Sequence, residues 1–364
     1  MTGISQLVGE FMIRVLIVDD SVFMRKLLTD LFAEESDYLV VDTARNGREA
    51  IDKIRWVKPD VITLDVEMPV LNGIQALETI MRENPTPVVM ISSLTQTGAE
   101  ATLKALELGA VDFVAKAKGP IANISNVKNE ILMKCRAAAK VNIKRLIQRP
   151  YPPTFSSHSK PAVSSLATLS DSLIAGKIVA IGASTGGPRA LQDIITNLPG
   201  NLPCGILVVQ HMPPGFTKSL AERLNSLSAL AVKEAEDNDI VLPGLVLIAP
   251  GDYHMTLTRE RGKPIIKLNQ NPPIGGHRPA VDPMLESVAQ VFGNKAIGVI
   301  LTGMGHDGSK GLRAIKDQHG YTIAEDQSTA VVFGMPKAAI ELGVVDKIAP
   351  VTGIAAEIVK AVTN

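Results

Sequence analysis

The amino-acid sequence predicts an α/β protein with two doubly wound domains, each built on a mostly parallel sheet. Short runs rich in Val, Ile and Leu alternate with amphipathic segments of helical period along most of the chain. Strands that are apolar throughout are typical of parallel sheets with helices on both faces. The alternation is interrupted once, over residues 148–172, by a stretch rich in proline, serine and threonine. Since 364 residues also exceed one typical domain, two domains are expected.

Five strand–helix units are predicted before the interruption. Their strands are residues 15–18, 38–43, 61–64, 88–91 and 112–115, and their helices are residues 24–34, 48–56, 74–83, 100–108 and 124–139. Five such units make a flavodoxin-like (βα)5 domain. The basic residues 140–149 continue the last helix in one interpretation and are its solvated end in the other.

The same rhythm resumes after the interruption. The predicted strands are residues 178–181, 206–209, 245–248, 296–301 and 322–324, with helices at 189–195 and 310–318. Two alternating runs within residues 255–268 flank Arg261-Gly262-Lys263 and predict a β-hairpin appended to the second sheet. The predicted segments are an N-terminal extension (1–12) without an assigned role, a first domain (13–139), an exposed linker (140–176) and a second domain (177–364).

Composition argues against several classes of function. Lys+Arg and Asp+Glu are both 37, and aromatic residues make up only 4%, so neither the positive charge nor the stacking surface of a nucleic-acid binder is expected. The two cysteines, Cys135 and Cys204, are far apart, which suits a reducing cytosol rather than a disulfide framework or a zinc site. Residues 1–10 lack the pattern of a signal peptide, and every apolar run is too short to span a membrane. A cytoplasmic protein is expected.

Polar residues follow the predicted strands of the first domain. Asp19 and Asp20 follow the first strand, Asp65 the third, Ser92 the fourth and Lys116 the fifth. Because the ends of parallel strands lie along one edge of a sheet, these side chains are expected to converge. Three carboxylates suit a hard divalent cation such as Mg²⁺, with Asp65 as a phosphate acceptor and the lysine and serine beside its phosphoryl oxygens.

A plainer interpretation of the first of these groups is that Asp19, Asp20 and Ser21 cap the following helix. The whole set in strand order is more specific. Residues 14–118 resemble a response-regulator receiver domain through the segments 18–21 (VDDS), 64–69 (LDVEMP) and 72–73 (NG).

The resemblance to receiver domains implies roles for individual residues. A histidine kinase would phosphorylate Asp65, and Mg²⁺ would bind Asp20 and Asp65, with Asp19 close by and the Glu67 carbonyl contributing. The receiver switch would be formed by Ser92, Phe113 and Lys116. One departure is Ala117, which stands where the family usually has proline, so the shape of that loop is in question.

A second candidate site lies in the second domain. Residues 182–188 (GASTGGP) join a predicted strand to a predicted helix and place Ser184 on a tight, glycine-flanked turn, as a nucleophile requires. His211 and Asp307 each follow another predicted strand, so a Ser-His-Asp triad is predicted, with His211 as general base and Asp307 holding its imidazole. Backbone N–H groups near Thr185 and Met304 are candidates for the oxyanion site.

Other interpretations of this site compete. A lone histidine after a strand is more often structural, and the order Ser, His, Asp is not that of α/β-hydrolases. The glycines at 303, 305 and 308 also fit a dinucleotide-binding fingerprint, and an NAD-linked enzyme is therefore an alternative. Against it, the charge of Asp307 would repel a pyrophosphate. His277 either borders a substrate cleft or belongs to an exposed loop.

Residues 177–363 resemble the catalytic domain of chemotaxis protein-glutamate methylesterases, the CheB family. The resemblance rests on residues 181–187 (IGASTGG), 210–212 (QHM), 277–279 (HRP), 281–282 (VD) and 301–308 (LTGMGHDG). It implies hydrolysis of glutamate methyl esters on chemoreceptors with release of methanol, deamidation of receptor glutamines in some members, and no cofactor for the esterase reaction.

Together the two resemblances imply a hydrolase that phosphorylation of the receiver activates by relieving a block on the esterase cleft. The expected partners are a chemotaxis histidine kinase and methyl-accepting receptors as protein substrate, with no nucleic acid, no membrane insertion and a monomeric chain. A receiver fused to a DNA-binding module, a transcription regulator, is the other alternative. It is weak because the second half is a strand-rich α/β sequence rather than a basic helix-turn-helix.

Overall fold

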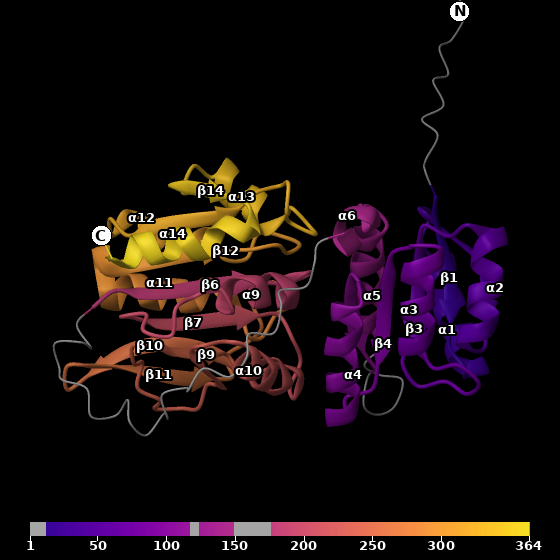
Figure 1. Cartoon of the computed structure of the whole chain (residues 1–364), viewed down its shortest axis with the longest axis horizontal. Coiled ribbons are helices and arrows are strands. Elements are labelled where there is room, and N and C mark those ends of the chain that lie inside the picture. Colours follow the sequence, from indigo (N-terminus) through magenta and orange to yellow (C-terminus); the bar gives the residue numbers. More distant parts are fainter. Residues whose placement is uncertain (1–11, 117–123, 149–175, 364) are drawn as a thin grey trace, which may run out of the picture. The chain divides into compact units, whose positions relative to one another are not determined.

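The chain folds into two compact units, one built on a five-stranded sheet and the other on a seven-stranded sheet (Figure 1). The computed structural model describes residues 12–116, 124–148 and 176–363. The prediction of two doubly wound α/β domains is confirmed. Most of the predicted N-terminal extension, most of the predicted linker and Ala117 lie outside the described residues.

The N-terminal sheet is parallel and has the strand order β2-β1-β3-β4-β5. Its strands are β1 (Ile13–Val18), β2 (Tyr38–Ala44), β3 (Val61–Asp65), β4 (Val88–Ser92) and β5 (Asp112–Ala115). Residues 15–18 are at most 1% exposed, because helices cover the sheet on both faces. Burying each such aliphatic side chain stabilises the fold by roughly 1.5–3 kcal/mol.

Five helices alternate with these strands. They are α1 (Val22–Ala33), α2 (Gly47–Val57), α3 (Gly73–Glu83), α4 (Gln96–Glu107) and α5 (Ile124–Ala138). Two of the helices begin at least two residues earlier than predicted, and a hydroxyl side chain caps the first turn of each: Ser21 Oγ accepts from Met24 N at 3.4 Å, and Thr95 Oγ1 accepts from Gly98 N at 3.0 Å.

The interpretation of residues 140–149 as a continuation of the last helix is wrong. The helix α5 ends at Ala138, and a separate short helix, α6 (Ile143–Gln148), follows. The side chain of Asn142 accepts a hydrogen bond from Arg145 N at 3.2 Å. An asparagine that bonds a backbone N–H three residues later starts a new helix, so the chain turns there instead of extending α5.

The C-terminal sheet is parallel throughout and has the order β14-β13-β12-β6-β7-β9-β8. Its strands are β6 (Ile178–Ala183), β7 (Gly205–Gln210), β8 (Ala231–Glu234), β9 (Leu245–Ile248), β12 (Ala296–Ile300), β13 (Tyr321–Glu325) and β14 (Lys347–Ala349). The first of these strands, β6, lies between β7 and β12. The strands that follow it in the chain are placed first on one side of β6 and later on the other. Such a point is where doubly wound sheets bind ligands, beyond the carboxyl ends of the strands.

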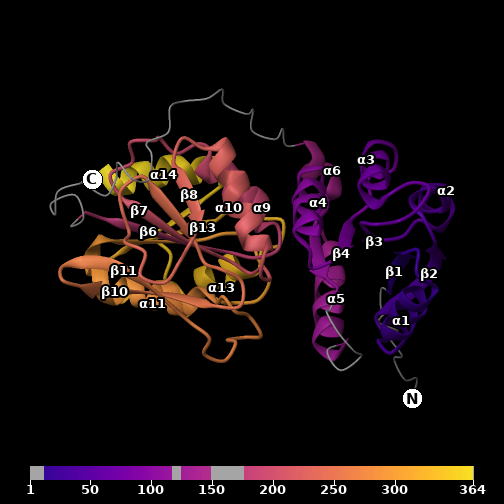
Figure 2. The same cartoon turned by 90° about the horizontal axis from the view of Figure 1, so that it is seen from below.

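Helices cover both faces of this sheet (Figure 2). One face carries α9 (Gly187–Ile195), α10 (Phe216–Leu227) and α14 (Val351–Thr363), which contact one another in sequence from α10 to α9 to α14. The other carries α11 (Val281–Phe292), α12 (Ser309–Asp317) and α13 (Met335–Glu341). The sequence predicted α9 and α12 but not α10, α11, α13 or α14. In α11, which packs against α12 and β10, the buried residues Val281, Leu285, Val288 and Phe292 recur at helical spacing, so a helical signal was present there.

The predicted hairpin forms from β10 (His254–Glu260) and β11 (Lys263–Asn269). Arg261 and Gly262 form its two-residue turn, and both have positive φ, of 48° and 80°. The sequence predicted a hairpin appended to the second sheet. In the structure the hairpin forms a separate two-stranded sheet, which is not hydrogen-bonded into the seven-stranded sheet as a further strand pair. It packs instead on α11, where Leu257 N donates to Ser287 Oγ at 2.9 Å.

None of the helices within residues 12–116, 124–148 and 176–363 is long and apolar enough to cross a bilayer.

Candidate active site

Three neighbouring strands of the C-terminal sheet end at the candidate active site. Ser184 follows β6, His211 follows β7, and Asp307 lies in the loop between β12 and α12. The ladder continues past the strand ends, because Ser184 N donates to Thr302 O at 3.0 Å and His211 N donates to Ala183 O at 3.2 Å. The predicted convergence of serine, histidine and aspartate is therefore produced by strand order, with the serine on the central strand of the three.

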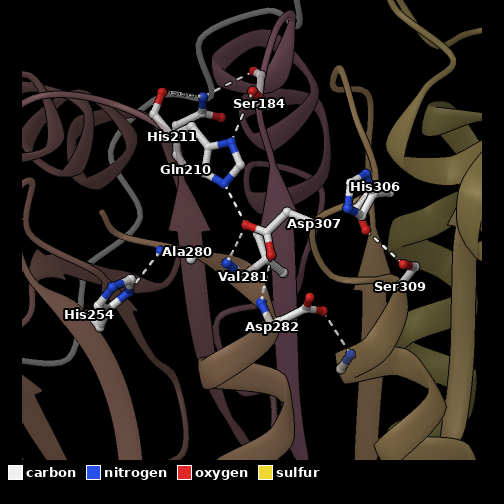
Figure 3. A network of polar contacts seen from close by, with 11 residues as sticks. Ser184, Gln210, His211, His254, Ala280, Val281, Asp282, His306, Asp307 and Ser309 are labelled. Atoms are coloured by element: carbon white, nitrogen blue, oxygen red, sulfur yellow. Dashed lines mark hydrogen bonds and ion pairs between the residues drawn. The ribbon is translucent and has the colours of Figure 1, made fainter. Parts of the chain in front are cut away.

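The three side chains form a continuous hydrogen-bonded line (Figure 3). Ser184 Oγ lies 3.2 Å from His211 Nδ1, and His211 Nε2 lies 2.8 Å from Asp307 Oδ2. The histidine side chain is 4% exposed and that of the aspartate 10%. A carboxylate accepts only, so Nε2 carries the proton and the lone pair of the neutral ring is on Nδ1, facing the serine hydroxyl.

Asp307 is held from its other side by the N-terminus of α11. Its Oδ2 accepts from Val281 N at 2.7 Å and its Oδ1 accepts from Asp282 N at 2.9 Å. Burial would raise the pKa of Asp307, but the hydrogen bond and charge of His211 and these two backbone N–H groups bring it below its ordinary value. The carboxyl of Asp307 is therefore ionised at the pH values at which a neutral imidazole can act as a base.

The turn after β6 requires its glycines for two different reasons. Gly186 has a φ of 78°, a left-handed conformation that disfavours a side chain, and it precedes α9 directly. At Gly187 a side chain is excluded by a steric clash, because a Cβ there would lie 1.9 Å from Gln210 Oε1. The sequence correctly identified this stretch as a strand-to-helix turn bearing a serine.

The glycine-rich segment at 303–308 is explained without a dinucleotide. A Cβ at Gly303 would lie 2.8 Å from the Cβ of Ser184 and 2.3 Å from Met335 Sδ, so this glycine lets the loop approach the serine. Gly308 has a φ of 91° and precedes α12. Asp307 faces the imidazole rather than solvent at the helix N-terminus. The segment thus serves the serine site, and the NAD-linked alternative is not favoured.

The two oxyanion candidates both lie beside the serine. Thr185 is 3% exposed, and its carbonyl accepts from Thr302 Oγ1 at 2.9 Å, which anchors the turn to the end of β12. Met304 follows Gly303, the glycine that packs against Ser184. Their role as oxyanion donors stays a prediction.

His277, whose environment the sequence left open, stacks on the imidazole of His211. The ring centroids are 3.8 Å apart and the planes are inclined by 10°. Its loop is fastened by Arg278, whose Nε lies 3.0 Å from Asp252 Oδ1. His254, 2% exposed, accepts from Ala280 N at its Nδ1 and donates to Pro272 O at its Nε2, both at 3.2 Å. The loop is thus packed over one face of the candidate base.

The predicted acidic cluster also forms, at the carboxyl edge of the N-terminal sheet. One ligand oxygen from each of Asp19, Asp20 and Asp65 lies within 4.8 Å of the others. Lys116 Nζ is 3.2 Å from Asp19 Oδ2 and 2.8 Å from Asp65 Oδ2. Burial raises the pKa of Asp65 to about 6, although the lysine opposes this. Three carboxylates this close are a suitable set of hard oxygen ligands for a Mg²⁺ ion.

The remaining receiver positions lie on or shortly after strands of the same sheet. Ser92 ends β4 and is fully buried, and its carbonyl accepts from Lys116 N at 2.7 Å. Phe113, in β5, is 3% exposed, and Lys134 Nζ lies 5.0 Å from the centre of its ring. Glu67 is exposed, and its backbone forms a hydrogen bond with the Asp65 carboxyl.

The capping interpretation holds for part of the first motif. Ser21 caps α1, and its backbone N–H donates to Asp19 Oδ1 at 2.9 Å. The carboxylates of Asp19 and Asp20 belong to the acidic cluster. One short stretch therefore starts a helix and supplies ligand groups.

Two parts of the serine site belong to segments named in the sequence motifs, but the sequence did not indicate what they contribute. The first is the pair of backbone N–H groups of Val281 and Asp282 that hold Asp307. An acidic residue followed by Pro283 is a usual signature of a helix start and could have located this N-terminus. The second is Gln210, whose side chain donates to Ser184 O at 3.0 Å. Its place at a strand end beside the serine strand was the available signal.

Two family models match the chain, one for each of its domains. Residues 15–126 match the family model of the response regulator receiver domain, and residues 179–358 match that of the CheB methylesterase. The chain is thus a receiver domain joined to a serine-site domain of the methylesterase class.

The similarity extends over nearly the whole chain. It is 50% identical over 351 residues to a protein-glutamate methylesterase/protein-glutamine glutaminase of Pyrococcus abyssi, covering 96% of this chain and 94% of that protein. A protein of the same name from Thermotoga maritima is also 50% identical over 351 residues, covering 96% and 98%. The solved catalytic domain of Thermotoga maritima CheB methylesterase is 55% identical, with a TM-score of 0.50, and covers 51% of this chain and 98% of that one. The chain belongs to the CheB family of protein-glutamate methylesterase/protein-glutamine glutaminases.

Proposed function

We propose that this protein hydrolyses glutamate methyl esters on chemoreceptors, releasing methanol, and deamidates receptor glutamines, with its receiver domain controlling the rate. The observation that carries the proposal is the line of contacts from Ser184 through His211 to Asp307, at 3.2 and 2.8 Å. It supports acyl transfer by a serine nucleophile, and family membership supports the choice of substrate.

In the first half of the reaction Ser184 Oγ attacks the ester carbonyl carbon while its proton passes to His211 Nδ1. The tetrahedral intermediate then collapses, the C–O bond to the methoxy group breaks, and the imidazolium returns the proton to methanol. In the second half the same Nδ1 takes a proton from a water molecule, which attacks the acyl carbon. The bond from that carbon to Ser184 Oγ then breaks, the imidazolium returns the proton to Oγ, and the glutamate carboxylate is released. A glutamine side chain follows the same route with ammonia as the leaving group.

Two further parts of the site assist these steps. Asp307 stabilises the imidazolium and keeps the ring in the orientation that presents Nδ1 to the serine. Backbone N–H groups near Thr185 and Met304 are proposed to bind the oxyanion, and such donors contribute about 3–4 kcal/mol each in known enzymes. Gly303 lets the segment that carries Met304 approach Ser184 closely.

In the receiver we propose that Asp65 accepts a phosphoryl group from a histidine kinase. Asp19, Asp20 and Asp65, with the Glu67 carbonyl, would hold Mg²⁺, which neutralises charge on the phosphoryl group when bound. Lys116, already beside Asp65 at 2.8 Å, would pair with a phosphoryl oxygen. Ser92 and Phe113 would respond to the modified aspartate and shift the domain to a second state that favours esterase activity.

The test of the proposed function is methanol release from membranes that contain radiolabelled methylated receptors. The full-length protein with Mg²⁺ and a small phosphodonor is expected to release methanol in proportion to enzyme concentration, and ammonia release from receptors with unmodified glutamines tests deamidation separately. Absence of methanol from well-folded protein under phosphorylating conditions would reject the proposed substrate.

Replacing Asp65 with asparagine is expected to abolish stimulation by the phosphodonor and leave basal methanol release in place. An amide cannot accept the phosphoryl group, while the serine site is unchanged. Coupling between sites is typically worth about 5- to 150-fold, and the wild-type stimulation is expected in that range. The matched control is Asp52→Asn, at an exposed position of α2, which should respond like the wild type. Stimulation of Asp65→Asn equal to the wild type would place the phosphoacceptor elsewhere.

A further inference from the structure

Gln210 occupies a position that neither the triad nor the proposed oxyanion site explains. It is the last residue of β7 and immediately precedes His211, and it is paired across the sheet with Ala183, which immediately precedes Ser184. Its side chain is directed toward the serine turn, where Nε2 donates to Ser184 O at 3.0 Å and to His211 O at 3.4 Å (Figure 3). One amide group therefore joins the main chains of the nucleophile and of the base.

The orientation of this amide is determined by its surroundings. Exchanging Oε1 and Nε2 would direct an oxygen at the carbonyl oxygens of Ser184 and His211, which accept hydrogen bonds and cannot donate them. On its other side the amide lies against Gly187, where a Cβ would be only 1.9 Å from Oε1. The glycine at 187 thus makes room for the glutamine side chain.

The fold itself gains little from having a glutamine here. Gln210 is 2% exposed, and none of the described residues donates a hydrogen bond to its Oε1. A buried amide oxygen without a donor is unfavourable compared with an apolar group of the same shape. The Ser184 carbonyl also accepts from Gly187 N at 2.7 Å and would keep a donor without the glutamine. The serine carbonyl therefore does not depend on Gln210 for a hydrogen bond.

We propose that Gln210 is a positioning residue for the proposed reaction, which sets the place of the Ser184 hydroxyl relative to His211 Nδ1. A serine side chain has a single torsion before its oxygen, so the position of the main chain largely determines where Oγ lies. An error of about 1 Å in such a contact can slow a reaction by about 100-fold. The amide ties the carbonyl groups of both residues to one side chain and so restrains the two main chains relative to each other.

The test is Gln210→Met, which keeps the length of the side chain and removes both polar atoms. We expect kcat for methanol release to fall about tenfold with KM unchanged, since binding of the receptor does not involve a buried amide. We expect the melting temperature to stay the same or rise, since the oxygen without a donor is removed. If the glutamine served the fold alone, its replacement would lower the melting temperature. A lower kcat with an unchanged or higher melting temperature therefore distinguishes a positioning role from a structural one. Gln290→Met, at an exposed position of α11, is the matched control and should change neither quantity.

The inference rests on the proposed function, so a second readout is needed that does not depend on the substrate. Labelling of Ser184 by a fluorophosphonate measures the reactivity of the hydroxyl directly, and its rate should also fall about tenfold in Gln210→Met. If the wild type labels but releases no methanol, the proposed substrate is wrong and the labelling rates still decide the role of Gln210.

Two results would overturn the role of Gln210. One is an unchanged kcat and labelling rate in Gln210→Met. The other is loss of folded protein in both Gln210→Met and Gln210→Leu, which would assign the residue to the fold rather than to the serine.

Discussion

Alanine in place of Ser184 is expected to lower kcat for methanol release by on the order of 10⁶-fold, the size of effect seen when a serine hydrolase loses its nucleophile. The hydroxyl is the atom that would bond to the substrate carbon, and it is the group that faces His211 Nδ1. Its removal should leave the fold intact, because the turn is held by backbone contacts such as Ser184 N to Thr302 O. Initial rates of methanol release, with melting temperature measured alongside, check both statements.

The matched control for the serine variant is Ser226→Ala, at an exposed site on α10 where the hydroxyl donates to a carbonyl of the same helix. It should keep full activity. Methanol release by Ser184→Ala at a rate close to that of the wild type would mean that another group is the nucleophile and would remove the basis of the proposed mechanism.

Asparagine in place of Asp307 is expected to lower kcat by about 10⁴-fold, and here stability should fall as well. The carboxylate accepts three hydrogen bonds, from His211 Nε2 and from the backbone N–H groups of Val281 and Asp282. An amide has one oxygen and one NH₂ group, so at least one of these donors must face another donor. The imidazole also loses the charge that stabilises its protonated form.

The stability difference between wild type and Asp307→Asn should depend on pH in a defined direction. The pKa of Asp307 is lowered below the ordinary value of 3.8 in the folded protein. A carboxyl of this kind contributes its stability fully above the unfolded pKa and loses it as the pH falls through the folded pKa. The difference in melting temperature should therefore be full at neutral pH and shrink below about pH 4.

Asp317→Asn, at the exposed end of α12, is the matched control for the aspartate variant and should change neither kcat nor the pH dependence. The two predictions differ in kind, because Ser184→Ala tests chemistry alone and Asp307→Asn tests chemistry and the anchoring of α11 together. A kcat of Asp307→Asn equal to that of the wild type would show that Asp307 does not assist His211 in the reaction.

Much of the two sites could be predicted because parallel sheets obey a simple geometric rule. Their strands all end on the same edge, so residues placed just after strands meet there regardless of their distance in sequence. This rule needs only the positions of short apolar runs, and it correctly places Ser184 together with His211 and Asp307. It also places Asp65 together with Lys116, and in the structure Lys116 Nζ lies 2.8 Å from Asp65 Oδ2.

Two errors in the interpretation of the sequence have different causes. The helix α11 was missed although its buried residues Val281, Leu285, Val288 and Phe292 recur at helical spacing, so the periodic signal was present in the sequence. The extension of α5 into residues 140–149 was wrong because charge pattern alone does not show that the side chain of Asn142 bonds a backbone N–H and starts α6.

By itself the amino-acid sequence determined the fold class, the strand-end location of both sites and the residue types that do their chemistry, because these depend on local periodicity and on turn residues. Only the tertiary structure decided which nitrogen of His211 faces the serine, that the N-terminus of α11 holds Asp307, that His277 stacks on the base and that Gln210 joins the two main chains. These contacts depend on the order of strands in the sheet and on the packing of side chains across it, and both arise from residues far apart in the chain.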